Sequence, residues 1–352
     1  MILGLFTFLI VLSILVFIHE LGHFTVARLL GVKVYVFSIG FGKKLISKKW
    51  KGTEWSFSLI PLGGYVKMKG QEDINPALAN NDSDSYNVKT PFQRILILLA
   101  GPFANFLLAF VLYIAIGLLG NNHLTATIGK IVENSPAQKA GLLVNDEIVK
   151  INDITIKTWD DLSGVIKDSN SPLQVYVKRD GVLKSFLILP QLSDSENMFK
   201  EKIRKRMIGI APAPKIVKIF YSPIDSIVFA YDKTIESSKM IFLGVQKLIQ
   251  GIIPSSEIGG VISIGTVISD ASQSSFVALL TIMALISVNL GVLNLLPIPA
   301  LDGGHIMFNL YEMITKRKPS DKVLVAMTVA GWAILLGLMS LGFYNDIIRL
   351  LE

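Results

Sequence analysis

Four long apolar stretches divide the chain, at residues 2–30, 95–119, 276–296 and 323–343. Each is close to or above the ~20 apolar residues that cross a bilayer as a helix. The first lacks the basic start and small-residue cleavage site of a secretory signal, so we expect it to remain as a span. A further stretch, residues 259–269, is short and flanked by charge. The pattern predicts a multi-pass α-helical membrane protein with four transmembrane helices.

The segments between the spans have periodic patterns of their own. In the loop of residues 31–94, the stretch WSFSLIPLGGYVKMKG (residues 55–70) alternates and contains glycines, which predicts a membrane-associated β-hairpin. Residues 120–212 alternate short apolar runs with turn residues, which indicates a small, mainly β domain. Its expected elements are strands at 128–132, 147–151, 173–180 and 183–190, a helix at 159–167, and residues 207–211 closing the sheet. Residues 216–248 favour amphipathic helices lying on the membrane or on the spans.

The composition supports a membrane protein and narrows its chemistry. Hydrophobic residues make up 51% of the 352 residues and charged residues 17%, with a mean hydropathy of +0.54. Soluble proteins carry roughly 25% charged residues. The sequence has no cysteine, so disulfides and thiolate metal sites are excluded, and a metal must be held by His, Asp or Glu. The net charge of +7 favours contact with anionic lipid and argues against a nucleic-acid partner.

The distribution of cations predicts the orientation in the membrane. Lysines crowd the loop of residues 31–94, and the short loop between the third and fourth spans contains Lys316, Arg317, Lys318 and Lys322. By the positive-inside rule both loops are cytoplasmic. Both termini and residues 120–274 then lie outside the cytoplasm.

Two histidines and a glutamate occur near the end of the first span. His19 and His23 are one turn apart on one helix face, so their imidazoles can hold one Zn²⁺. Glu20 points to an adjacent face and can act as general base on the attacking water. The alternative is a chance HExxH, expected in roughly one per cent of chains this long. Ionisable residues in spans are rare and functional, which favours a metal site.

Asp302, in the stretch NLLPIPALDGGH after the third span, is the expected third ligand. With four spans, the first and third run in the same direction, so their C-terminal ends lie on one side of the membrane. If residues 259–269 crossed as well, the ligands would lie on opposite faces. The alternatives are that Asp302 is an ordinary loop aspartate, or that His305 is the ligand.

Two asparagines and two prolines end the third span. Pro297 and Pro299 interrupt its helical hydrogen bonding, and Asn289 and Asn294 precede them at membrane depth. An asparagine there can hydrogen-bond an extended substrate backbone or a developing oxyanion. The alternative for both is a contact between helices.

Three motifs in this order carry a family resemblance: HELGH, GPFANF and NLLPIPALDGG. They resemble the site-2 protease family of intramembrane zinc metalloproteases, and more closely its bacterial RseP-type members, over nearly the whole chain. The resemblance implies that His19, His23 and Asp302 bind Zn²⁺. It also implies that Glu20 is the catalytic base and that Asn294 helps hold the substrate. The implied substrates are single-span membrane proteins, such as anti-sigma factors and remnant signal peptides, cut within the lipid bilayer.

Two further segments resemble parts of such proteins. SPAQKAGLLVNDEIVKIND (residues 135–153) resembles their periplasmic PDZ domain, with Asn145-Asp146 and Asn152-Asp153 replacing the usual glycine turns. One PDZ-like unit is visible, and its groove either engages peptide termini as an added strand or only blocks bulky ectodomains. Residues 55–70 resemble a membrane-reentrant β-loop whose edge can pair with an unwound substrate; the alternative is a plain cytoplasmic loop.

The expected regions are therefore the first two spans with their loop (1–119), the PDZ domain (120–212), an amphipathic helical segment (213–274) and the last two spans (275–352). The expected activity is hydrolysis of peptide bonds inside the membrane. Two other interpretations are a zinc-containing scaffold that captures peptides without cutting, and a metal transporter. Glu20 argues against a scaffold, which needs no general base. The single compact cluster of ligands argues against a transporter.

Overall fold

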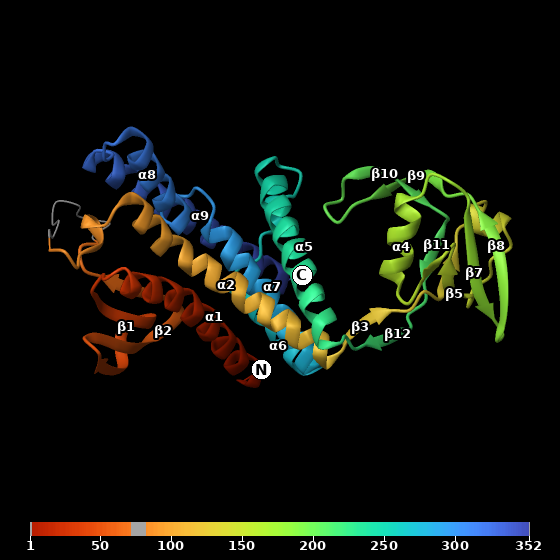
Figure 1. Cartoon of the computed structure of the whole chain (residues 1–352), viewed down its shortest axis with the longest axis horizontal. Helices are drawn as coiled ribbons and strands as arrows, with labels where there is room; N and C mark the ends of the chain where they lie inside the picture. The colour runs from red at the N-terminus through yellow and green to blue at the C-terminus, as the bar shows by residue number, and fades with distance from the viewer. Residues whose placement is uncertain (1, 72–81, 352) are drawn as a thin grey trace. The chain divides into compact units, whose positions relative to one another are not determined.

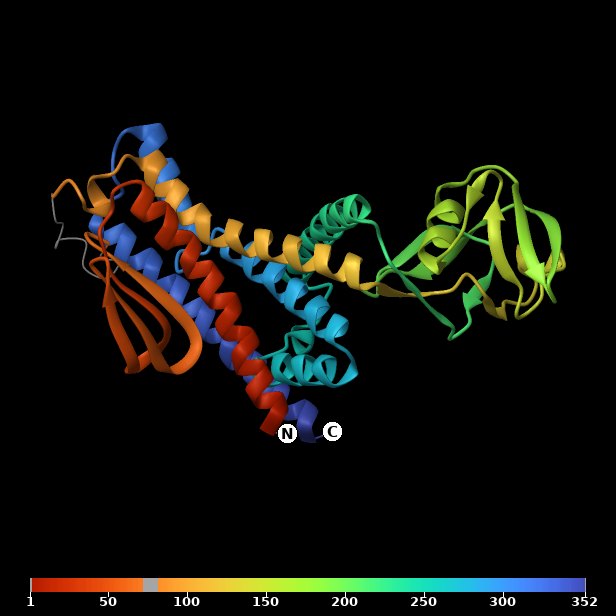
Figure 2. The same cartoon turned by 60° about the horizontal axis from the view of Figure 1, so that its bottom comes forward.

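The computed structural model describes residues 2–71 and 82–351. Contacts divide the chain into two compact units. Met1–Ile116 and Pro223–Glu352 form the first, which we call the membrane unit, and Gly117–Ser222 form the second, the inserted unit. Figures 1 and 2 show a mainly helical membrane unit with a small β-sheet, and a mainly β inserted unit.

Within the described residues, four helices are long and apolar enough to cross a membrane. They are α1 (Ile2–Leu29), α2 (Pro91–Leu119), α7 (Phe276–Asn294) and α9 (Asp321–Leu351). Their ends lie within a few residues of the predicted ones, except that α9 runs further at its C-terminus. Residues 259–269 fall in α6 (Val261–Ser274), whose 14 residues are too few to cross a bilayer as a helix. The prediction of four spans is thus confirmed at the level of helix length and composition.

The loop after α1 forms a sheet from two long, bent strands, β1 (Val34–Trp50) and β2 (Thr53–Met68). Residues 36–39 pair with residues 64–67 on one side and with residues 54–57 on the other. Residues 44–50 pair with residues 53–58. The prediction of a hairpin inside residues 55–70 is therefore wrong: its two halves flank β1 and do not pair with each other. The glycines indicated a local turn, but each half of the segment pairs with residues 36–39 of β1 instead.

The inserted unit contains a four-stranded sheet in the order β6-β5-β7-β8. Its strands are β5 (Glu147–Ile151), β6 (Ile154–Thr155), β7 (Leu173–Arg179) and β8 (Val182–Ile188). The buried core is aliphatic and includes Ile148, Ile151, Leu162 and Val175. Two short helices, α3 (Pro136–Lys139) and α4 (Trp159–Asp168), complete this part. Thr158 and Asp161 form a capping box at the start of α4, which explains why that helix begins where the sequence predicted.

The other strands of the inserted unit form three two-stranded sheets. They pair β4 (Ile128–Ile131) with β11 (Ile210–Pro212), β9 (Gln191–Glu196) with β10 (Lys202–Met207), and β3 (Asn121–Leu124) with β12 (Ile216–Ile219). Residues 207–211 were expected to close the main sheet, but β11 pairs with β4 alone. Residues 216–219 were expected to be helical; their pairing with β3 makes them a strand.

The turns of the inserted unit use residues that tolerate a left-handed backbone. Asn145 and Asn152 have φ of 72° and 50°, so asparagine replaces glycine there at little cost. Next to the first turn, Arg179 Nε donates to Asp146 Oδ1 at 2.6 Å. Burial alone would raise the pKa of Asp146, but the hydrogen bonds from Arg179 and from the Leu143 N–H outweigh it and lower that pKa. Asp146 is thus held as a carboxylate that fixes the turn.

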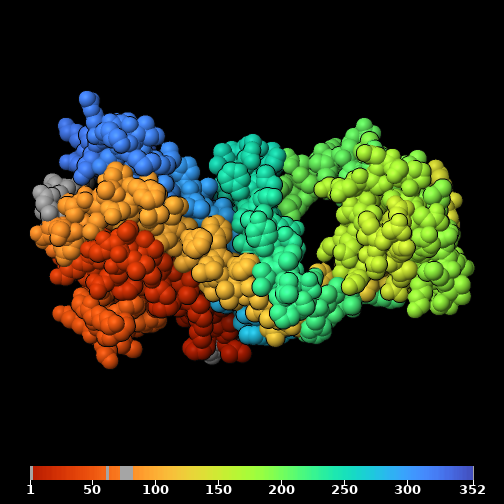
Figure 3. Space-filling view, in the orientation of Figure 1, coloured from red at the N-terminus to blue at the C-terminus, as the bar shows by residue number. Residues whose placement is uncertain are grey.

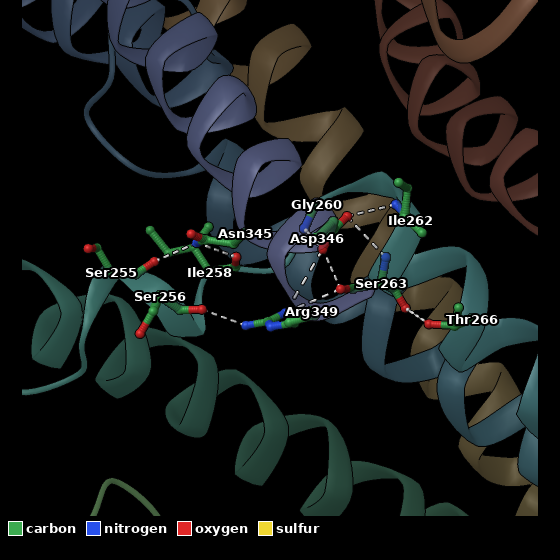
Figure 4. A network of polar contacts seen from close by, with 10 residues as sticks. All are labelled: Ser255, Ser256, Ile258, Gly260, Ile262, Ser263, Thr266, Asn345, Asp346 and Arg349. Atoms are coloured by element: carbon green, nitrogen blue, oxygen red, sulfur yellow. Dashed lines mark hydrogen bonds and ion pairs between the residues drawn. The ribbon is translucent and has the colours of Figure 1, made fainter. Parts of the chain in front are cut away.

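Two helices connect the inserted unit to α7: α5 (Pro223–Ile249) and α6, with the 3-10 turn η3 (Ser255–Glu257) between them. Tyr113 of α2 and Ser237 of α5 share a buried hydrogen bond of 3.0 Å. The start of α6 is capped by α9: Asp346 accepts hydrogen bonds from the N–H groups of Gly260, Ile262 and Ser263 (Figure 4). The carboxylate thus satisfies backbone donors that the helix itself leaves open.

Candidate active site

Three potential metal ligands lie close together, two on α1 and one at the end of the segment that follows α7. His19 and His23 lie on α1, and Asp302 is the first residue of α8 (Asp302–Thr315). The two His Nε2 atoms are 3.2 Å apart, and each lies 3.4 Å from Asp302 Oδ2. Tetrahedral Zn²⁺ with bonds of about 2.0–2.1 Å separates its ligand atoms by about 3.4 Å. The triangle therefore has the size of one face of a zinc coordination sphere.

The hydrogen bond on the far side of His23 sets its tautomer. His23 Nδ1 lies 2.8 Å from the Ile97 carbonyl oxygen, which can only accept, so Nδ1 carries the proton. Nε2 then presents its lone pair to the other two ligands. Gly101 of α2 makes room for this ring, because a Cβ there would lie 2.2 Å from His23 Nε2. A polar side chain of α1 is thus fixed by the backbone of α2.

Asn105 of α2 plays the corresponding part for His19. Asn105 Nδ2 lies 3.1 Å from His19 Nδ1, while the buried Oδ1 has no hydrogen-bond partner among the described residues. The two ends of an amide have nearly the same shape. Turned by 180°, Asn105 Oδ1 accepts from His19 Nδ1–H and gains the partner it lacks. Both Nε2 lone pairs and a carboxylate oxygen then face one another. These electron-rich atoms repel one another, so the arrangement requires a cation between them.

Two glycines position Asp302. A Cβ at Gly303 would lie 2.2 Å from the Leu296 carbonyl oxygen, and one at Gly304 would lie 2.4 Å from that of Ile298. The connection after α7 can therefore fold tightly over the start of α8. Asp302 Oδ2 is thereby held 3.4 Å from the Nε2 atoms of both His19 and His23. A carboxylate oxygen in that place is a suitable third ligand for a cation.

Glu20 lies beside this cluster and next to the sheet. Its carboxylate forms no hydrogen bond or ion pair within the part of the chain that the structure describes. A Cβ at Gly64 of β2 would lie 3.0 Å from Glu20 Cγ and 2.7 Å from Val16 Cγ1. Only glycine lets the strand approach the helix so closely. Residues 64–67 pair with β1 along one edge, and no described strand pairs with their other edge.

The remaining predicted residues form no described contact with the metal triangle. Asn289 and Asn294 lie on α7 with partly exposed side chains, and neither has a hydrogen bond to another described residue. His305, the rival ligand, is outside the cluster that joins His19, His23 and Asp302. It instead lines a separate small pocket with Arg94 and Glu312.

Sequence reasoning missed the contribution of α2. Asn105 and Gly101 both belong to the GPFANF motif, which carried a resemblance but no assigned role. An amide in the middle of an otherwise apolar span was the available signal, since such a group must find a polar partner. Its partner is 86 positions away in the sequence, so spacing alone did not identify it.

Known proteins resemble this chain over nearly its whole length. The model of peptidase family M50 matches residues 7–338. A Campylobacter jejuni protein described as a candidate zinc metalloprotease is 47% identical, over 97% of this chain and 92% of its own length. A similarly described Helicobacter pylori protein (strain 26695) is 39% identical over 97% and 98%. Metalloprotease MmpA of Caulobacter vibrioides is 33% identical over 98% and 95%.

Proposed function

This chain belongs to peptidase family M50, the site-2 protease family, and on that premise we propose that it is a zinc metalloprotease that cuts peptide bonds inside the membrane. The observation that carries the proposal is the triangle of His19, His23 and Asp302, with distances of 3.2–3.4 Å. Its corners come from two different segments of the membrane unit. Evolutionary relatives described as zinc metalloproteases support the same conclusion.

We assign the roles as follows. His19, His23 and Asp302 hold Zn²⁺, which when bound acidifies a water molecule and polarises the scissile carbonyl. Glu20 accepts the proton of the attacking water and then passes it to the leaving amine. Asn105 and the Ile97 carbonyl hold the imidazoles in the orientation that the ligands need.

The substrates we propose are single-span membrane proteins, of the anti-sigma-factor or remnant-signal-peptide kind. A helix must be unwound before its peptide bonds are accessible. The unpaired edge of residues 64–67, beside Glu20, offers backbone groups to an extended strand. Asn294, and more remotely Asn289, are proposed to hold the other side of that strand through their amides. Both asparagines have unused hydrogen-bonding groups among the described residues, which supports this assignment.

We further propose the orientation that the loop charges predict. Both termini and the inserted unit lie in the periplasm, and the metal site lies near the cytoplasmic side of the inner membrane. The inserted unit is proposed to be a single PDZ domain of the RseP type. Its short strand β11 pairs along one edge only, so the other edge can take a peptide terminus as an added strand.

Incubation of the purified protein with a single-span model peptide tests the proposal. Cleavage should require metal, cease with a chelator, and return when Zn²⁺ is restored. Glu20→Gln should keep its zinc, by elemental analysis, yet lose nearly all cleavage, because Gln cannot accept the proton. Metal retained together with wild-type cleavage would remove Glu20 from this role. Metal and peptide binding without any cleavage by the wild-type protein would instead support a scaffold.

A further inference from the structure

A further pocket lies in the membrane unit, and none of the three residues of the metal triangle lines it. It has a volume of about 130 Å³ and is lined by residues of α2, α8 and the start of α9. Its polar lining consists mainly of Arg94, His305, Asn309, Glu312 and Lys318. In Figures 1 and 2, α8 lies beside the first turns of α2, and Figure 3 shows the two surfaces in contact there. The mechanism proposed above uses none of these residues.

One residue that lines this pocket has a buried acceptor with no partner among the described residues. Asn309 is only 6% exposed, and its Nδ2 donates to the His305 carbonyl oxygen at 2.7 Å. Its Oδ1 is buried and forms no hydrogen bond within residues 2–71 and 82–351. A buried acceptor without a donor is unfavourable, because it has lost its hydrogen bonds to water and gained none in the protein. An occupant of the pocket that brings an N–H or O–H group would give Asn309 Oδ1 the donor it lacks among the described residues.

The charges around the pocket define the rest of the occupant. Arg94 Nη2 lies 2.8 Å from Glu312 Oε2, and the two side chains are 12% and 15% exposed. Arg94 Nε donates to the Lys89 carbonyl oxygen, which leaves its other guanidinium N–H groups available. Lys318 adds a second cation, so two cations face one carboxylate. The site suits a single negative charge, with the hydrogen-bond donor next to it.

The position of the pocket indicates which kind of molecule supplies the negative charge and the hydrogen-bond donor. Arg94 is in the first turn of α2, and Lys318 lies three residues before the start of α9. The ends of membrane spans lie at the level of the lipid head groups, where Lys and Arg attract phosphates. Phe308, Pro319 and Leu324 line the same pocket and offer apolar contact to the glycerol end of a lipid.

We propose that this pocket binds the head group of a membrane phospholipid whose polar end can donate a hydrogen bond. The phosphodiester lies beside Arg94 and Lys318, and the ammonium of ethanolamine or a hydroxyl of glycerol donates to Asn309 Oδ1. Choline has no N–H or O–H group, so its lipid would leave Asn309 Oδ1 unpaired. The pocket therefore selects phosphatidylethanolamine and phosphatidylglycerol over phosphatidylcholine.

Native mass spectrometry of the full chain, released from micelles containing equal amounts of the three lipids, measures this selectivity. Phosphatidylethanolamine and phosphatidylglycerol should be retained about fivefold or more over phosphatidylcholine, as expected from one unsatisfied hydrogen bond. Equal retention of phosphatidylcholine would overturn the proposal. Millimolar inorganic phosphate should not displace the retained lipid; if it does, the pocket is an anion site and not a lipid site.

Two variants locate the effect. Asn309→Leu should abolish the preference over phosphatidylcholine, since it removes the acceptor at similar size. Lys318→Gln should weaken retention of all three lipids severalfold, whereas Lys322→Gln, the same charge loss outside the pocket lining, should not. Equal effects of the two lysine changes would contradict the site. If Asn309→Leu does not fold, the selectivity of the wild-type protein and the lysine pair still decide the matter.

Discussion

At the scale of single residues, the metal triangle depends on groups that never touch the metal. Asn105 is fully buried and lies 3.1 Å from His19 Nδ1. Such partners fix the tautomer and direction of a ligating imidazole. Asn105→Ala should therefore weaken zinc affinity by about 10–100-fold, measured by competition with a chromophoric chelator. Cleavage at saturating zinc should fall less than affinity does.

The matched control for that change is Asn289→Ala, which removes an amide from a neighbouring span but no described hydrogen bond. It should leave zinc affinity unchanged. If Asn105→Ala also leaves zinc affinity unchanged, His19 does not depend on this amide and the assignment of its tautomer is incorrect.

Sequence reasoning worked best for ionisable residues that occur in or next to apolar spans. His19, Glu20 and His23 interrupt an apolar span. With four spans, the first and third run in the same direction, which indicated that Asp302 lies on the same side of the membrane as these residues. The structure places His19, His23 and Asp302 close enough together to hold one metal ion. Asn105 was not predicted, because no local pattern tells which residues of α1 and α2 lie opposite each other. Gly22, whose Cβ would lie 2.2 Å from the Ala100 carbonyl oxygen, sets that alignment and can be recognised only in three dimensions.

At the scale of elements, the helices were predictable and the sheet beside the site was not. A membrane span is recognised by its own length and apolarity, which need no knowledge of neighbours. The pairing of β1 with β2 depends on contacts between residues far apart along the chain. The glycines of residues 55–70 therefore suggested a turn, although Gly64 is used for a close approach to α1.

The contact between α6 and α9 provides a test at this scale. Asp346 is 1% exposed and accepts from three backbone N–H groups at 2.9–3.1 Å. Asp346→Ala leaves these donors without a partner, which should cost roughly 1–3 kcal/mol. Thermal unfolding in detergent should show the lower midpoint. Asp270→Ala, an exposed change on α6, should have almost no effect, and equal losses for both variants would contradict the capping role.

At the scale of the whole molecule, the function depends on an arrangement in which the first and third spans run in the same direction. The sequence has no cysteine, so single cysteines report topology without background. Lys48→Cys should react with an impermeant reagent only from the cytoplasmic side, and Lys178→Cys only from the periplasmic side. Both side chains are exposed. Labelling of both positions from the same side would contradict the four-span arrangement.

The central claim is that one zinc ion joins the first span to the segment after the third. Zinc content per chain, measured by elemental analysis on the wild type, Asp302→Ala and His305→Ala, tests it most directly. We predict about one zinc in the wild type and in His305→Ala. Asp302→Ala should lose zinc on dialysis, because two imidazoles on one helix do not hold the ion tightly. Full zinc in Asp302→Ala, with loss in His305→Ala, would contradict the site described here.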